Sequence, residues 1–105
     1  MTTDQYTDTL DFVKTLVLVN HQQRLGILQN ISKKQCAIIR QVAYNILFNS
    51  SINLTDKDRS YLRRHSKSVK ELASRRVCLK RKTAILVKKH QLVKYLAELT
   101  LRYLR

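Results

Sequence analysis

The sequence contains no proline, no tryptophan and a single glycine, Gly26, so the residues that most often mark turns are almost absent. A β-sandwich or barrel needs many tight turns, and this scarcity therefore disfavours both architectures. The chain of 105 residues is long enough to form one small core and too short for two. We predict an all-α fold, a single-domain bundle of four to five short amphipathic helices.

Acidic residues are also scarce, with seven Asp and Glu against 21 Lys and Arg, which gives a net charge of +14. Residues 1–54 hold five of the cations and three acids, whereas residues 55–105 hold sixteen cations and four acids. We expect a frayed N-terminus over residues 1–7 and one helical domain over 8–105, with a near-neutral apolar half (8–54) and a strongly basic half (55–105). With 44% hydrophobic residues, the chain is too apolar to be a disordered cationic peptide.

No arrangement of residues typical of a catalytic or metal site is found in the sequence. The two cysteines, Cys36 and Cys78, lie far apart, and His21, His65 and His90 are widely separated without a nucleophile or ligand partner at a suitable spacing. A glycine-rich phosphate loop is excluded because there is only one glycine. We therefore predict a protein that is not an enzyme, binds no metal or cofactor and buries both thiols.

Long hydrophobic runs are absent as well. The longest apolar run covers only residues 16–19, far short of the roughly 20 residues that span a membrane. We expect no membrane-spanning segment, and an intracellular, reducing location is consistent with the two unpaired cysteines.

Helix boundaries can be predicted from capping residues. Asp8 is the expected N-cap of a helix over residues 9–20, followed by a polar connection with a short helical turn. Ser32 and Gln35 form a capping-box pattern before a core helix that ends at about residue 48, and Thr55 and Asp58 repeat the pattern before a long helix to about residue 75. Further helices are expected over 79–89 and 91–104.

The last predicted helix has an apolar stripe broad enough either to close the core or to associate with a second copy of the chain. Core closure is favoured because a chain this small has few other ways to cover its apolar faces. The residues of this stripe, which are also the candidates for a homo-oligomer contact, are Leu92, Leu96, Leu99 and Tyr103.

The basic half carries its charge mainly between Arg59 and Lys89, where Glu71 is the only acid. Apolar residues interrupt the charge at helical spacing, so the segment is predicted to fold with an inner apolar face and an outer cationic face. Such a density of charge is typical of proteins that bind backbone phosphates. The predicted phosphate-contacting residues are Arg59, Arg63, Arg64, Lys67, Lys70, Arg75, Arg76, Lys80, Arg81, Lys82, Lys88 and Lys89.

Other interpretations of the same charge stay open. A helix-turn-helix with residues 79–89 as the helix that reads bases is one, but its polar residues are nearly all Lys rather than the Asn, Gln and Arg that contact base edges. The basic face could instead bind an acidic protein, as in a minor capsid or scaffold protein, or merely keep the chain in solution.

Several short stretches within residues 54–90 carry a family resemblance. They are Leu54-Thr55, Tyr61-Leu62-Arg63-Arg64-His65, Leu72-Ala73-Ser74-Arg75-Arg76-Val77, Leu79-Lys80-Arg81-Lys82 and Ile85-Leu86-Val87. In this pattern the chain resembles the small basic proteins encoded by Maverick/Polinton elements and adintovirus-like DNA viruses of animals. The resemblance covers roughly half of the chain and extends less clearly to residues 32–48. Members of that family continue into a Gly-Gly-Phe and an apolar tail, whereas this chain continues into an amphipathic helix.

The resemblance implies a viral or virus-derived origin and a small virion or genome-associated protein, and it supplies no catalytic residues. Together with the charge, it leads us to expect a protein that binds the backbone of double-stranded DNA without sequence specificity, as a genome-condensing or capsid-interior component. The expected locations are the virion and the host nucleus, and capsid proteins are possible partners.

Overall fold

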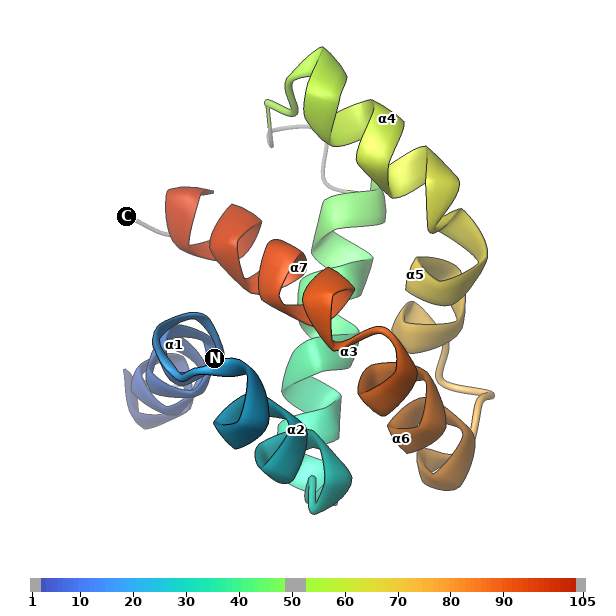
Figure 1. Cartoon of the computed structure of the whole chain (residues 1–105). Helices are drawn as coiled ribbons and strands as arrows, with labels where there is room; N and C mark the ends of the chain where they lie inside the picture. Colours follow the sequence, from blue (N-terminus) through green and yellow to red (C-terminus); the bar gives the residue numbers. More distant parts are fainter. Residues whose placement is uncertain (1–2, 49–52, 104–105) are drawn as a thin grey trace.

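The computed structural model describes residues 3–48 and 53–103, with side chains described for 8–48 and 53–102, and it confirms the all-α class. The described residues form more helices than the four to five predicted and contain no strand (Figure 1). The helices are α1 (Thr3–Leu18), α2 (His21–Gln29), α3 (Lys33–Phe48), α4 (Asp56–Arg64), α5 (Ser66–Ala73), α6 (Leu79–Lys88) and α7 (His90–Tyr103).

The first helix starts earlier than predicted. Since α1 begins at Thr3, residues 3–7 are helical rather than frayed, while residues 1–2 lie outside the described residues. Asp8 therefore sits within the helix and is not its N-cap. Its Oδ2 lies 3.2 Å from Nζ of Lys34 on α3, and this ion pair links the two helices on the protein surface.

Both predicted capping boxes are present. The backbone N–H of Gln35 donates to Oγ of Ser32 (3.0 Å) and that of Ser32 donates to Oε1 of Gln35 (3.1 Å). Thr55 and Asp58 make the equivalent pair of bonds, both 3.1 Å long. A third capping box that was not predicted begins at Asn20 and starts α2, which turns the predicted polar connection into a regular helix.

The predicted long helix over residues 55–75 is in fact two helices. The break lies at His65, whose backbone adopts φ −114° and ψ 18° and whose N–H bonds to the carbonyl of Leu62 (3.1 Å). The following turn then starts α5 in a new direction. This bend lets α4 lie near α7 while α5 packs against α3.

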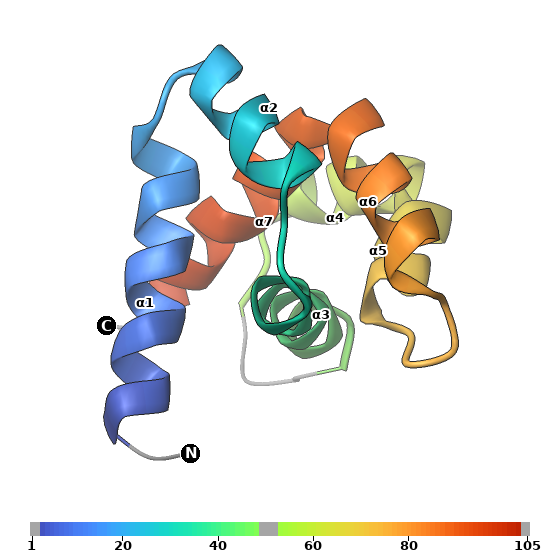
Figure 2. The same ribbon diagram turned by 90° about the horizontal axis from the view of Figure 1, so that it is seen from below.

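The helices are arranged with α3 and α7 in the interior and the other elements around them (Figures 1 and 2). Helix α1 lies on one side of this pair, whereas α4, α5 and α6 follow one another along the opposite side. Helix α7 packs on α1 and α3, and α6 packs on α2 and α5. The largest fully buried side chains are Leu16, Leu28, Leu72, Leu86, Leu92, Leu96, Leu99, Val13, Val69 and Val93.

The stripe on α7 therefore closes the core. Leu92, Leu96 and Leu99 are each 1% exposed, which agrees with the favoured prediction and leaves them unavailable for the alternative, a contact with a second copy of the chain. The side chain of Tyr103, the fourth residue of that prediction, lies outside the described residues. None of the helices in the described ranges is long and apolar enough to cross a membrane.

A buried arginine completes the near-neutral half. Arg24 is 4% exposed, and its guanidinium donates to the carbonyls of Leu16 (2.8 Å) and Val19 (2.9 Å) at the C-terminal end of α1. A cation is favourable there because the last carbonyls of a helix carry partial negative charge and lack partners within the helix. This arginine thus has a structural role and adds little to the surface charge.

Candidate nucleic-acid interface

Helices α4, α5 and α6 bring most of the predicted phosphate-contacting residues to one side of the molecule. This side is opposite α1 in both ribbon views (Figures 1 and 2). The predicted residues that are exposed there are Arg59, Arg63, Arg64, Lys67, Lys70, Arg75, Arg76, Lys80, Arg81 and Lys88.

Most of these cations have no carboxylate partner among the described residues. Arg64 lies over the ring of Tyr61, with its guanidinium carbon 5.7 Å from the ring centroid, and this contact leaves its charge unneutralised. We define the basic surface as the predicted contacts that are exposed and form no ion pair with a described residue, namely Arg63, Arg64, Lys67, Lys70, Arg75, Arg76, Lys80 and Lys88. Their charges are free to attract an anion from solution.

Two predicted contacts are exposed but already paired. Arg59 lies 3.8 Å from Asp56, and Nη2 of Arg81 lies 3.2 Å from Oε2 of Glu71. Glu71 is the only acid between Arg59 and Lys89. Through the pair with Arg81, its carboxylate faces α6. Exposed pairs of this kind contribute little stability. The pair nevertheless holds Arg81 beside α5, across the connection between the two helices.

The connection over residues 74–78 is ordered by local hydrogen bonds. The N–H of Ser74 donates to the carbonyl of Glu71 (3.3 Å), and the N–H of Arg76 donates to Oγ of Ser74 (3.1 Å). Cys78 then precedes α6 in an extended conformation, with no hydrogen bond from its side chain to the helix. Its thiol is exposed, so the prediction that both cysteines are buried is correct only for Cys36. The loop therefore presents Arg75 and Arg76 to solvent from a defined backbone.

Lys82 is the clear exception among the predicted contacts, because it is buried with 6% of its surface exposed. It lies three and four residues before Ile85 and Leu86, which places it on the inner face of α6. Burial lowers the pKa of the Lys82 ammonium, and the nearby charge of Arg40 acts in the same direction. The prediction that Lys82 belongs to the outer phosphate-binding face is wrong, and its spacing from the apolar residues could have revealed this.

Lys89 is half-buried and joins the ends of two helices. Its Nζ lies 3.3 Å from Nδ1 of His65, at the junction of α4 and α5. Because an ammonium only donates, Nδ1 must accept, which leaves the imidazole neutral with its proton on Nε2. Burial lowers the pKa of His65, and the charges of Lys89 and Arg64 lower it further. Through this contact, Lys89 links the end of α6 to the junction of α4 and α5 and is not a free cation of the surface.

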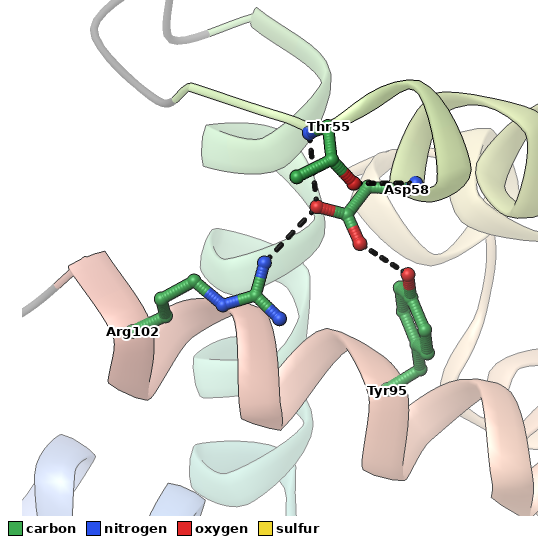
Figure 3. Close-up of polar contacts among 4 residues, drawn as sticks. All are labelled: Thr55, Asp58, Tyr95 and Arg102. Atoms are coloured by element: carbon green, nitrogen blue, oxygen red, sulfur yellow. Dashed lines mark hydrogen bonds and ion pairs between the residues drawn. The ribbon is translucent and has the colours of Figure 1, made fainter.

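The first turn of α4 is fixed to α7 through Asp58, which is 3% exposed (Figure 3). The phenol of Tyr95 donates to Oδ1, while Nη1 of Arg102 (3.0 Å) and the N–H of Thr55 (3.1 Å) donate to Oδ2. Burial alone raises the pKa of Asp58, but these bonds outweigh burial and hold the pKa below its ordinary value. Burial and the bond to Asp58 raise the pKa of Tyr95 to about 12. The cluster thus anchors the first turn of α4 to α7, while the cations of α4 remain exposed to solvent.

An open cleft with a volume of about 490 Å³ lies among the end of α1, α2, α4 and α7. Its cations are already engaged, because Arg24 donates to backbone carbonyls and Lys94 lies 3.9 Å from Glu98. Nearby, the rings of His21 and His90 pack edge to face at 4.1 Å, and Nδ1 of His90 is buried with no hydrogen-bond partner among the described residues. The cleft therefore lacks the free positive charge that a phosphate backbone requires.

Two cations on this side were not among the predicted contacts. Lys57 is exposed on α4, and Arg40 of α3 is half-buried beside Lys82. Lys57 could have been included from its place in the basic half. Arg40 has no local signal, because its position depends on how α3 packs against α6.

No family model matches the chain, and comparisons with curated proteins and with solved structures found no match. The resemblance to the small basic proteins of Maverick/Polinton elements accordingly stays a prediction.

Proposed function

We propose that this protein binds the phosphate backbone of double-stranded DNA without reading the base sequence, and that it does so through the basic surface. Its proposed role is that of a non-enzymatic, genome-condensing or capsid-interior component of a DNA virus or virus-derived element. The proposed locations are the virion and the host nucleus. The viral context rests on the sequence resemblance, whereas the binding of phosphates rests on the structure's charge distribution.

The observation that carries the proposal is the set of exposed cations on consecutive helices α4, α5 and α6 that have no acidic partner among the described residues. Solubility is usually served by a balanced mixture of both charges, whereas the surface acids described on α4, α5 and α6, Asp56 and Glu71, are far outnumbered by cations. Backbone phosphates require charge and reach, and long Lys and Arg side chains provide both.

The composition of α6 favours backbone contacts over base contacts. Its inner face is committed to the core through Ile85 and Leu86, and its exposed polar residues are Lys80, Arg81 and Lys88. Asn and Gln, which form paired bonds with adenine, are missing from this helix. A helix-turn-helix regulator built on α5 and α6 is therefore the weaker alternative.

The dependence of DNA affinity on salt tests this proposal. If all eight residues of the basic surface contact phosphates, the logarithm of affinity should fall with the logarithm of salt concentration with a slope of about −7. The variant Arg75→Gln/Arg76→Gln should bind more weakly, and its slope should be less steep by about 2.

The matched control is Lys14→Gln/Lys33→Gln, which removes the same charge from exposed positions on α1 and α3. It should leave both affinity and slope close to those of the native protein. Equal losses in the two double variants would show that only net charge matters and would contradict a defined binding surface.

A second candidate function is that of a minor capsid or scaffold protein whose basic face meets an acidic protein. The exposed aromatic pair of Tyr44 (46% exposed) and Phe48 (65% exposed) favours it, because large apolar side chains on a surface are common at protein contacts. Sizing of the purified protein before and after nuclease treatment separates the two. A discrete oligomer that is insensitive to nuclease would support the capsid or scaffold role.

A further inference from the structure

The cleft among the end of α1, α2, α4 and α7 is lined by two aromatic side chains. Tyr61 of α4 and Tyr95 of α7 both line it, and their rings stack with centroids 4.0 Å apart and planes inclined by 21°. Both side chains are half-buried, and Asp58 holds the phenol of Tyr95 in place (Figure 3). The cleft volume of about 490 Å³ lies within the roughly 300–1,000 Å³ typical of small-molecule sites. The cleft is therefore large enough to take a planar ring beside this aromatic pair.

Several polar groups that line the cleft have no hydrogen-bond partner among the described residues. They are the hydroxyl of Tyr61, the side-chain amide of Gln91 and the amide nitrogen of Asn20, whose oxygen already accepts from the N–H of Gln23. Hydroxyl and carboxamide groups supply both donors and acceptors. The edge of a nucleobase presents donors and acceptors in the same way, and amide side chains form paired bonds with adenine.

The charges around the cleft favour an anionic ligand over a cationic one. Glu98 is the only acid among the described residues that line the cleft, and it already lies 3.9 Å from Lys94. Arg64 lies over the ring of Tyr61, with its guanidinium carbon 5.7 Å from the centroid, and it belongs to the basic surface. A cation without an ion pair to a described residue is thus next to an aromatic side chain of the cleft.

We propose that this cleft binds the base of an unpaired nucleotide, stacked against the Tyr61 and Tyr95 pair, with the phosphate of that nucleotide at Arg64. Stacking on aromatic side chains is a general way of binding unpaired bases, and it tolerates any sequence because every base has a π-face. A base within a duplex is already stacked and paired, so only an unpaired one is available to the cleft.

The nucleotide can come from an unpaired position in a nucleic acid or from a free mononucleotide. The first source rests on the proposed DNA-binding function, whereas the second is independent of it. The base and its attached phosphate are the same chemistry in both cases.

Titration of the isotope-labelled protein with adenosine monophosphate, followed by NMR, tests the site, with ribose-5-phosphate as the probe that lacks the base. Adenosine monophosphate should bind more tightly than ribose-5-phosphate and shift the amide resonances of Asn20, Gln91 and Lys94. Tyr61→Leu should weaken this binding about fivefold or more, and Tyr61→Phe, which keeps the ring, should lose less. Tyr44→Leu, which removes an exposed tyrosine of α3 outside the cleft, should bind like the native protein.

Equal affinities for adenosine monophosphate and ribose-5-phosphate would overturn the proposal, as would shifts confined to the basic surface or an unchanged affinity in Tyr61→Leu. If Tyr61→Leu fails to fold, Gln91→Leu takes its place, because this position is exposed and the change removes only hydrogen-bonding groups. An affinity about threefold weaker is expected for Gln91→Leu, and an unchanged affinity would count against the site.

DNA binding then identifies the source of the nucleotide. The probes are one duplex with a single-stranded adenine overhang and the same duplex with abasic nucleotides in the overhang, which keep the number of phosphates equal. If the cleft takes a base from nucleic acid, the native protein should prefer the adenine overhang, and Tyr61→Leu should lose this preference. Equal affinities for the two duplexes would assign the cleft to free mononucleotides. A native protein that binds adenosine monophosphate but no DNA would overturn the proposed function and leave the nucleotide site standing.

Discussion

Helices α4 and α6 both carry cations of the basic surface, but they begin in opposite ways. The first turn of α4 contains Asp56 and Asp58 and is closed by a capping box with Thr55. The first turn of α6 contains no acid, and Cys78 gives it no side-chain cap. Acids at a helix N-terminus complement the helix dipole, whereas cations such as Lys80 oppose it.

The difference shows that the protein accommodates its positive charge in two ways. In α4, two acids in the first turn, Asp56 and the buried Asp58, compensate for the cations that follow, so the helix is stabilised largely by its own first turn and by α7. In α6, stability comes from packing, because Ile85 and Leu86 are buried against the rest of the core. Changes at the two helix starts should therefore have unequal consequences.

The largest effect is expected from Asp58→Ala, which leaves Tyr95 and Arg102 without their shared acceptor. Because the side chain of Arg102 is 50% exposed, the loss should fall below the 3–5 kcal/mol typical of fully buried pairs, at about 2–3 kcal/mol in the free energy of unfolding. Urea denaturation followed by circular dichroism measures this loss. Asp56→Ala, two residues away and fully exposed, serves as the control and should change stability little. A loss equal to that of the control would mean that α4 does not depend on its link to α7.

Removing the cap of α4 and adding a cap to α6 should produce smaller effects of opposite sign. Thr55→Ala removes the α4 cap and should destabilise the protein by about 1 kcal/mol. Cys78→Ser places a capping hydroxyl before α6 and should stabilise it by about 0.5 kcal/mol. The same denaturation experiment measures both, with Ser60→Ala on the exposed face of α4 as the reference for removing a hydroxyl away from a cap, where a gain of about 0.5 kcal/mol from helix propensity is expected. A gain from both substitutions would contradict the contrast between the two helix starts.

The smallest effect is expected at the C-terminal ends of α4 and α6, where Lys89 bonds to His65. The pKa of His65 is lowered from its ordinary value of about 6.5 in the folded protein. At pH values just below 6.5, the unfolded chain therefore binds more protons than the folded protein. Stability should therefore fall as the pH decreases from 7 toward 5. His90, whose pKa is lowered by burial and by His21 and Arg24, contributes in the same direction.

His65→Asn keeps an acceptor near the position of Nδ1 but cannot titrate in this range, so it should reduce the slope of stability against pH. Thermal unfolding at a series of pH values measures this slope. An unchanged slope would show that His90 alone is responsible. Below pH 4 a separate loss is expected in both proteins, since the lowered pKa of Asp58 stabilises the fold only while its carboxylate is charged.

The all-α class, two of the capping boxes and the location of the charge could be predicted because they depend on residues close together in the sequence. The break at His65 could not, since nothing in the local pattern opposes a continuous helix and the bend serves the packing of α4 and α5 on different partners. The link from Asp58 to α7 was likewise hidden, because Tyr95 and Arg102 lie 37 and 44 residues from it in the sequence.

The cluster around Asp58 also has a consequence for the motions of the folded protein. Because one carboxylate accepts bonds from the start of α4 and from two turns of α7, the first turn of α4 cannot open without releasing Tyr95 and Arg102. Amide hydrogens in the first turns of α4 and in the second half of α7 should therefore exchange with deuterium as one cooperative unit. By contrast, the uncapped start of α6 should exchange independently and faster, so two neighbouring parts of the same cationic side would differ in their opening rates.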